Sequence, residues 1–322
     1  MGGPNHEAPA RASLHGLVGA PTYCRRVLLL HTSDWHLGRG FHGVGLLAAQ
    51  QQVLDHLVEV VRAERVDVVV VAGDVYDRAL PSVDTVRLLD DAIARLRGAG
   101  AQVLLTSGNH DSATRLGFGG AVLEQAGVHL RTHARDLARP VLLDDAHGPV
   151  ALYGVPYLEP ALAAEAVGAS ARTHEAVLGA ALDAVRTDLA ARPGTRSVVA
   201  AHAFVVGGEG SDSERDIGVG GVGSVPASVF GGVSYAALGH LHGRQQVGPT
   251  ARYSGSPLAY SFSEARHTKG SWLVRLGATG VEQVDPVAAP VPRRLAVLRG
   301  RLDDLLADPG TGSPSARGAT SR

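Results

Sequence analysis

Residues 68–74 read Val68-Val-Val-Val-Ala-Gly-Asp74, a short apolar run that ends abruptly in a carboxylate. The run lacks the alternation of apolar and polar residues that marks a half-exposed strand, so it predicts a strand buried on both faces. Four further runs rich in Val, Leu or Ala also lead directly into polar residues, and they cover 27–30, 103–105, 198–201 and 235–238.

Helical patterns separate the first three of these runs. Apolar side chains recur at helical spacing over 46–61 and again over 86–96, with Asp84 as the expected N-cap of the second helix and Gly98 as its stop. Residues 161–191 indicate another amphipathic, Ala-rich helical stretch. Strands that alternate with helices predict a layered α/β fold, in which reactive groups gather at the carboxyl ends of the strands.

The bulk composition limits the classes of protein to which the chain can belong. Its 322 residues are 45% hydrophobic, enough to bury one large core with a small appendage. The formal charge of −1 lacks the basic excess of a free-standing DNA binder, so metals, a local patch or a partner would have to attract nucleic acid.

The sequence also indicates a compartment. Cys24 is the one cysteine, which excludes an intramolecular disulfide and agrees with a reducing cytoplasm. The N-terminus lacks the pattern of a signal peptide, and no apolar run approaches the roughly 20 residues of a membrane span. We therefore expect a cytoplasmic protein.

The ends of the chain differ in pattern from its middle. Residues 1–26 are typical of a disordered extension, with Val27 as an alternative start of translation, and residues 309–322 are typical of a disordered tail. From about residue 286 prolines break the chain, and 295–306 predicts one strand and a short helix. Residues 207–224, rich in Gly and Ser, form either a solvated loop or a loop beside the site.

Nine polar side chains follow the five apolar runs. Residues two apart at a strand end point the same way, so the pair Asp34 and His36 can face one ion, as can His240 and His242. A lone histidine at a strand end is more often packed than metal-bound, as we expect for His31. Chance alone, however, would have to place ligand-type side chains at five separate strand ends. The nine are Asp34, His36, Asp74, Asn109, His110, Asp111, His202, His240 and His242.

Carboxylate, amide and imidazole groups occur here in the numbers that two adjacent divalent ions need. One carboxylate must bridge ions roughly 3.5–4 Å apart, and Asp74 is the candidate. Mixed nitrogen and oxygen ligands suit Mn²⁺, Fe²⁺ or Zn²⁺ better than Mg²⁺. The first ion is expected to take Asp34, His36, Asp74 and His242, and the second Asp74, Asn109, His202 and His240.

At superfamily level these motifs resemble those of the calcineurin-like metallophosphoesterases. Three longer stretches, 31–39, 237–244 and 253–263, are similar to the SbcD family of bacterial nuclease subunits within that superfamily. The resemblance implies two β-sheets sandwiched by helices over 27–285. It also implies that 286–308 begins a capping domain that is truncated here, which puts DNA positioning and partner binding in question.

The resemblance further implies a Mn²⁺-dependent nuclease that acts in DNA repair, recombination and replication. Its activities would be a 3′–5′ exonuclease on double-stranded DNA and an endonuclease on single strands and hairpins. The implied partners are DNA, an SbcC-type ATPase, and a second copy of the chain that pairs through parts of 46–62 and 84–97 within a heterotetramer.

In the expected mechanism His110 contacts the phosphate and protonates the leaving 3′ oxygen, while Asp111 orients its ring. Two alternatives stay open at this point. The metal motifs alone also suit a phosphomonoesterase or a cyclic-nucleotide phosphodiesterase, and a short C-terminus would suit a non-catalytic scaffold subunit.

Overall fold

Two six-stranded β-sheets lie face to face in the computed structural model, which describes residues 26–214, 223–298, 300, 301 and 303. The first sheet has the order β16-β15-β1-β4-β5-β6, and the second has the order β13-β14-β12-β9-β8-β7. The first comprises β1 (Leu28–Thr32), β4 (Val68–Ala72), β5 (Gln102–Thr106), β6 (Val128–Arg131), β15 (Gly270–Gly277) and β16 (Gly280–Ala288). The second comprises β7 (Val141–Asp145), β8 (Gly148–Val155), β9 (Arg196–His202), β12 (Tyr235–Gly239), β13 (Gln245–Gln246) and β14 (Ala251–Tyr253).

Each sheet contains four parallel strands. Antiparallel strands flank them on one side in the first sheet (β15 and β16) and on both sides in the second (β13 and β7). In the first sheet β1, β4, β5 and β6 run parallel, and in the second β8, β9, β12 and β14 do. The five apolar runs read from the sequence are β1, β4, β5, β9 and β12, so that prediction is confirmed. Two short ribbons accompany them: β2 (Gly40–Phe41) with β3 (Val44–Gly45), and β10 (Phe204–Val205) with β11 (Ser224–Val225).

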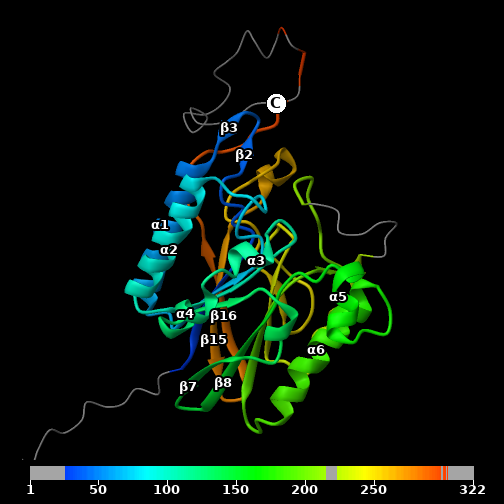
Figure 1. Ribbon diagram of the computed structural model, residues 1–322. Helices are drawn as coiled ribbons and strands as arrows, with labels where there is room; N and C mark the ends of the chain where they lie inside the picture. The colour runs from blue at the N-terminus through cyan, green and yellow to red at the C-terminus, as the bar shows by residue number, and fades with distance from the viewer. Residues whose placement is uncertain (1–25, 215–222, 299, 302, 304–322) are drawn as a thin grey trace, which may run out of the picture.

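Helices cover the outer faces of the two sheets (Figure 1). The first sheet packs against α1 (Leu47–Glu64) and α2 (Val83–Gly98), and the second packs against α6 (His174–Ala190). The expected fold of two sheets between helices is therefore confirmed. The described residues also form three shorter helices: α3 (Ala113–Leu116), α4 (Gly120–Gln125) and α5 (Pro160–Val167). Among the described helices, none combines the length and apolar character that a membrane crossing requires.

The layering explains the unbroken apolar runs. In β4, Val68 and Val70 enter the core between the two sheets, whereas Val69 and Val71 enter the core beneath α1 and α2. All of these side chains are fully buried. Because both faces of the strand are covered, apolar residues are favoured at every position.

Local details differ from the sequence prediction at three places. Ser82, rather than Asp84, caps α2, because its extended backbone lets the hydroxyl accept the Thr85 N–H, while Asp84 already lies in the first turn. The helical stretch 161–191 is two helices, since Gly168 adopts φ +70° and ends α5. Pro286 lies within the edge strand β16, past the predicted boundary at residue 285, where a missing N–H is tolerated.

The predicted disordered extension before Val27 and the predicted disordered tail over 309–322 lie outside the described residues, apart from Arg26. The strand and short helix predicted over 295–306 fall partly outside them.

His31 joins the two sheets near the carboxyl ends of their strands. Its Nε2 donates to the Leu238 carbonyl at 3.1 Å, and its Nδ1 accepts from the Tyr235 hydroxyl at 2.9 Å. Burial lowers the pKa of His31 to about 3, so its ring stays neutral. The residue is structural, as the sequence predicted, and it ties β1 to β12.

A buried ion pair joins the sheets at the opposite end. Asp145 and Arg196 have side chains that are 1% and 3% exposed, and their closest atoms are 2.6 Å apart. Asp145 also accepts the Val27 N–H at 2.8 Å, and Arg196 donates to the Gly277 carbonyl at 3.0 Å. Burial alone would raise the pKa of Asp145, but hydrogen bonds from Arg196 and Val27 hold it at about 2.

This pair yields a stability prediction. Asp145→Asn leaves Arg196 buried without a counter-ion, so we expect it to lower the free energy of unfolding by about 3 kcal/mol at pH 7. The carboxylate stabilises above its ordinary pKa, so the difference from wild type should shrink as the pH falls from 4 through about 2. Urea unfolding measures both effects. Asp183→Asn, in an exposed pair, should change stability by less than about 0.5 kcal/mol.

Candidate metal centre

The candidate ligands lie just beyond the carboxyl ends of five strands, where the two sheets converge. Four of them have a left-handed backbone: φ is +52° at Asp34, +44° at His36, +47° at Asp74 and +108° at His240. This conformation costs a side-chain-bearing residue about 1–3 kcal/mol and persists only where its surroundings enforce it. Here backbone hydrogen bonds link Asp34 to Gly73 at 3.1 Å and His36 to Asp74 at 2.9 Å.

Glycines precede three of the ligands because the backbones come too close for a side chain. A Cβ at Gly239 would lie 1.8 Å from the Ala72 carbonyl oxygen, which belongs to the other sheet. A Cβ at Gly108 would lie 2.1 Å from Asp74 Oδ1. The Gly-His motif therefore reflects the contact between the two sheets, and the Gly-Asn motif reflects the contact between the loops that follow β4 and β5.

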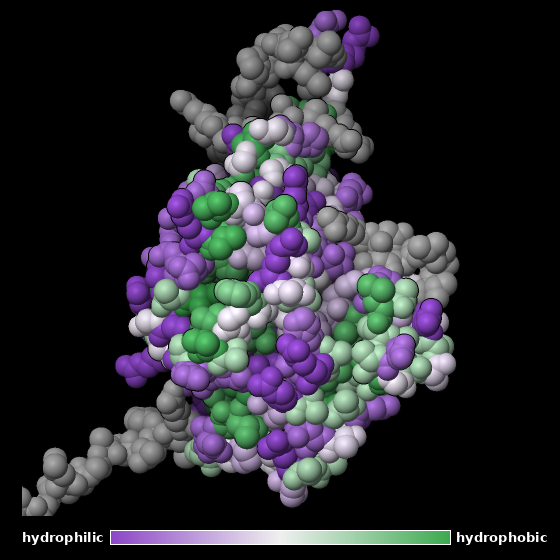
Figure 2. All heavy atoms as spheres, in the orientation of Figure 1, coloured by the Kyte–Doolittle hydropathy of each residue, from purple (hydrophilic) through white to green (hydrophobic). Residues whose placement is uncertain are grey.

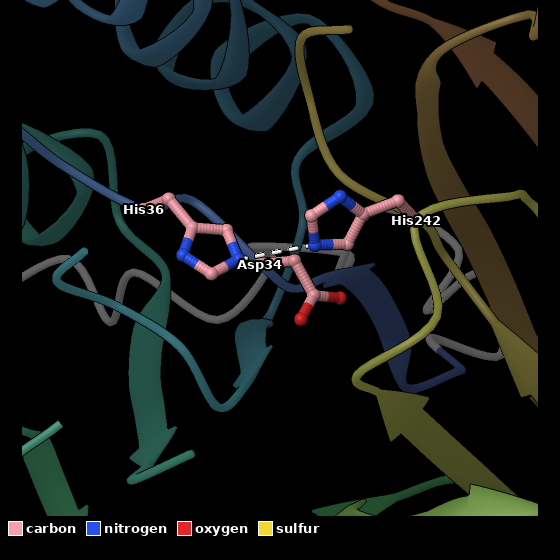
Figure 3. Close-up of side chains that lie close together, drawn as sticks. All are labelled: Asp34, His36 and His242. Atoms are coloured by element: carbon pink, nitrogen blue, oxygen red, sulfur yellow. Dashed lines mark hydrogen bonds between the residues drawn. The ribbon is translucent and has the colours of Figure 1, made fainter. Parts of the chain in front are cut away.

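Asp34, His36 and His242 form the first close group. Their ligand atoms lie within 4.8 Å of one another, and all three residues are buried. Figure 3 shows the two imidazoles turned toward each other beside the Asp34 carboxylate, with His36 Nε2 and His242 Nε2 3.1 Å apart.

Asp74 lies at the centre of the site. Its Oδ2 is 3.6 Å from His36 Nε2 in the first group and 3.5 Å from His202 Nε2 on the other sheet. Asp34, Asp74 and His202 themselves form a second close group. One carboxylate oxygen thus faces histidines of both predicted ligand sets.

The hydrogen bonds decide which ring nitrogen of His202 carries the proton. Its Nδ1 donates to the Ala72 carbonyl at 3.0 Å, so Nε2 has a free lone pair, and this lone pair faces Asn109 Oδ1 at 2.9 Å. Two acceptors at that distance lack a proton to share, and a cation between them would satisfy both. The residues present therefore fit a metal ion.

The protonation states of the buried groups also favour a bound cation. Burial, then the neighbouring His242 and His110, lower the pKa of His36, and burial together with His202 lowers that of His240. Burial and the Asp74 charge raise the pKa of Asp34. His36 and His240 are therefore neutral, which is the form that binds metals, and the crowded carboxylates call for positive charge.

His240 lies at the border of the cluster. It belongs neither to the two groups above nor to the third close group found among the described residues, which is formed by His36, Asp77 and His110. Its ring centroid is 5.4 Å from that of His202. Its backbone N–H donates to Asp34 Oδ1 at 3.0 Å. Its assignment to the second ion stays a prediction.

His110 and Asp111 have different partners from those expected. His110 Nδ1 donates to the Asp77 carbonyl at 2.9 Å, which leaves Nε2 facing the site, 3.9 Å from Asp74 Oδ2. The carboxylate of Asp111 accepts the backbone N–H groups of Val75, Tyr76 and Gly108 at 2.8–3.0 Å. Asp111 therefore holds together the two loops that carry Asp74 and Asn109, and the Asp77 carbonyl orients the His110 ring.

Several residues around the site were missed by sequence reasoning. Asp77 Oδ1 lies 3.5 Å from His36 Nδ1 and 3.3 Å from Arg39, and its place three positions after Asp74 was a usable signal. The described part of the 207–224 loop lies beside the site, because Ser213 Oγ is 2.7 Å from His242 Nδ1. Glu214 accepts the His242 N–H at 2.7 Å.

The fold is that of a calcineurin-like phosphoesterase, and that family matches residues 27–160. The SbcD component of the nuclease SbcCD from Staphylococcus saprophyticus is 32% identical over 285 residues, which cover 86% of this chain and 73% of the relative. The chain thus belongs to the SbcD family of calcineurin-like phosphoesterases and is a hydrolase of phosphoester bonds. Among solved structures, GAP50, the anchor in the inner membrane complex of Plasmodium, covers 84% of this chain and 90% of its own, with 11% identity and a TM-score of 0.41.

The close approach of the sheets can be tested at Gly239. Gly239→Ala places a methyl group against the rigid Ala72 carbonyl, so we expect a loss of about 2 kcal/mol or more in the free energy of unfolding, together with weakened metal binding. The matched variant Gly179→Ala lies in α6 with open space around it and should stabilise by about 0.5 kcal/mol. Equal stability of the two variants in urea unfolding would contradict the contact.

Proposed function

We propose that this chain is a Mn²⁺-dependent DNA nuclease, a 3′–5′ exonuclease on double-stranded DNA and an endonuclease on single strands and hairpins. The central observation is Asp74 Oδ2, which lies about equally far from His36 Nε2 (3.6 Å) and His202 Nε2 (3.5 Å), as a carboxylate bridging two ions would. The name of the Staphylococcus relative, which describes it as part of a nuclease, supports DNA as the substrate.

The proposed ligand sets follow from this centre. The first ion would be held by Asp34, His36, Asp74 and His242, and the second by Asp74, Asn109, His202 and His240. Two divalent ions bound here would acidify an attacking water and neutralise the phosphate charge. Neutral imidazoles mixed with carboxylate and amide oxygens suit Mn²⁺.

His110 is the proposed general acid. The Asp77 carbonyl can only accept a hydrogen bond, so it fixes the Nδ1 proton and turns Nε2 toward the site. Donation from Nε2 requires a ring that carries protons on both nitrogens, and as the bond between phosphorus and the 3′ oxygen breaks, the Nε2 proton would pass to that oxygen. Asp111 would act indirectly, by holding the loops that carry Asp74 and His110.

The proposed partners are DNA, an SbcC-type ATPase and a second copy of the chain. A charge of −1 gives weak long-range attraction to DNA, which favours substrate delivery by a partner. Apolar side chains interrupt the polar surface on the side of α1 and α2 (Figure 2), among them Leu80, Val83 and Val86, and this agrees with pairing through these helices. Residues beyond β16 would begin a capping domain, and the protein would act in the cytoplasm in DNA repair, recombination and replication.

The activity is tested with metal-free protein and added Mn²⁺. We expect chelation to abolish cleavage of blunt duplexes and hairpins and Mn²⁺ to restore it, with greater rates when an SbcC-type ATPase is present. A small aryl phosphate should be a poor substrate. If the protein instead hydrolyses the aryl phosphate efficiently and leaves DNA intact, it is a phosphomonoesterase. If it hydrolyses neither substrate, even with the ATPase present, it is a scaffold subunit.

His110→Ala separates catalysis from metal binding. Loss of the acid should lower kcat for DNA cleavage by about 10²–10⁴-fold. Mn²⁺ affinity, measured by titration calorimetry, should stay near the wild-type value because His110 is not a proposed ligand. His147→Ala, in the turn between β7 and β8, is the matched control and should change neither quantity. A His110 variant that no longer binds Mn²⁺ would refute this division of roles.

Asp74→Asn tests the bridging role. Loss of one carboxylate shared by both sets should weaken both ions, so we expect the bound Mn²⁺ to fall from two ions toward none. Anomalous scattering from crystals soaked in Mn²⁺ counts the ions directly. Two fully occupied sites in this variant would rule out a bridge at Asp74.

A further inference from the structure

The loop that follows β14 carries a buried ion pair that is not among the proposed ligands. Glu264 and Lys269 have side chains that are 0% and 6% exposed, and Lys269 Nζ donates to Glu264 Oε2. Lys269 is the one lysine of the chain. Removing two charges from water is costly, so such a pair persists where further hydrogen bonds offset its desolvation.

Those further hydrogen bonds converge on one residue, His242. Glu264 Oε1 lies 3.3 Å from His242 Nδ1 and accepts from the Ser213 hydroxyl, which is itself 2.7 Å from that ring nitrogen. Lys269 Nζ donates to the His242 carbonyl at 2.8 Å. The same ion pair therefore holds both the ring and the backbone of His242.

The direction of each hydrogen bond follows from the carboxylate. Glu264 can only accept, so the Ser213 hydroxyl donates to it and uses its own lone pair to accept from His242 Nδ1–H. The proton of His242 is thereby placed on Nδ1. Its Nε2 then carries a lone pair, which faces His36 Nε2 at 3.1 Å within the site.

The rest of the loop is shaped to hold this pair. Ser256 Oγ accepts from Lys269 at 2.9 Å, and the Tyr260 N–H donates to Glu264 Oε2 at 3.2 Å. A Cβ at Gly255 would lie 2.6 Å from the His242 carbonyl oxygen. The stretch 253–263, singled out in the sequence, thus surrounds His242 although it supplies none of the proposed ligands.

We propose that Glu264 is a positioning residue for the metal centre, acting through Ser213 and His242, and that Lys269 holds its carboxylate in place. This inference rests on the proposed function, because it assigns His242 to the first ion. A carboxylate behind a histidine ligand fixes its tautomer and ring orientation and strengthens it as a donor.

Glu264→Gln tests the proposal. It keeps the side-chain volume but removes the carboxylate that places the His242 proton on Nδ1. Mn²⁺ affinity, measured by titration calorimetry, should fall by about 10–100-fold. DNA cleavage should shift to higher Mn²⁺ concentrations and recover to within about threefold of wild type at saturation, because the reacting groups remain in place.

Asp145→Asn is the matched control, since it also breaks a buried ion pair but at the other end of the sheets. It should lower stability while leaving Mn²⁺ affinity within about twofold of wild type, because distant sites act independently. An equal loss of affinity in both variants would show a general effect of destabilisation and would overturn the proposal.

Ser213→Ala keeps the test decisive if Glu264→Gln fails to fold. It removes the hydroxyl between Glu264 and His242 and leaves the ion pair intact, so Mn²⁺ affinity should fall by roughly fivefold. The positioning role alone would be overturned if the wild-type chain binds Mn²⁺ and cleaves DNA while Ser213→Ala and folded Glu264→Gln bind Mn²⁺ as tightly as it does. Failure of the wild-type chain to bind Mn²⁺ would overturn the proposed function as well.

Discussion

Buried polar groups crowded between the two sheets are the constraint around which this protein is built. His202 Nε2 meets Asn109 Oδ1 at 2.9 Å, and His36 Nε2 meets His242 Nε2 at 3.1 Å. The carboxylate of Asp74 lies between the two pairs. Taking so many polar groups out of water is costly, so the surrounding fold must supply the free energy that holds these groups together.

The two sheets supply that free energy. Apolar side chains fill the space between them, His31 bridges β1 and β12 near the site, and the ion pair of Asp145 and Arg196 closes the far end. With the sheets fixed at both ends, the strand ends cannot relax away from one another. The left-handed backbone at Asp34 and Asp74 and the close contact at Gly239 follow from that fixed spacing.

The sequence was informative where the cause was local. Five apolar runs predicted the central strands, and the polar residues that end them predicted the site, because strand direction alone brings such residues to one edge. The break at Gly168 and the cap at Ser82 were missed because helix breaks and caps depend on one or two backbone angles.

The supporting residues were beyond sequence reasoning for a different reason. Glu264 and Lys269 contact His242 from 22 and 27 positions away, and Ser213 from 29 positions on the other side. No periodicity records such contacts, since they depend on how two loops pack. Likewise, the partners of Asp111 are three backbone N–H groups, which any sequence could offer.

The division of the site between the two sheets has a consequence for folding. Asp34, His36, Asp74 and Asn109 follow strands of the first sheet, whereas His202, His240 and His242 follow strands of the second. A partly folded chain with one sheet in place would hold at most four of the seven proposed ligands and could not bind the two proposed ions. Competence for hydrolysis would therefore require both sheets to be packed together, and it would be lost as soon as they separate.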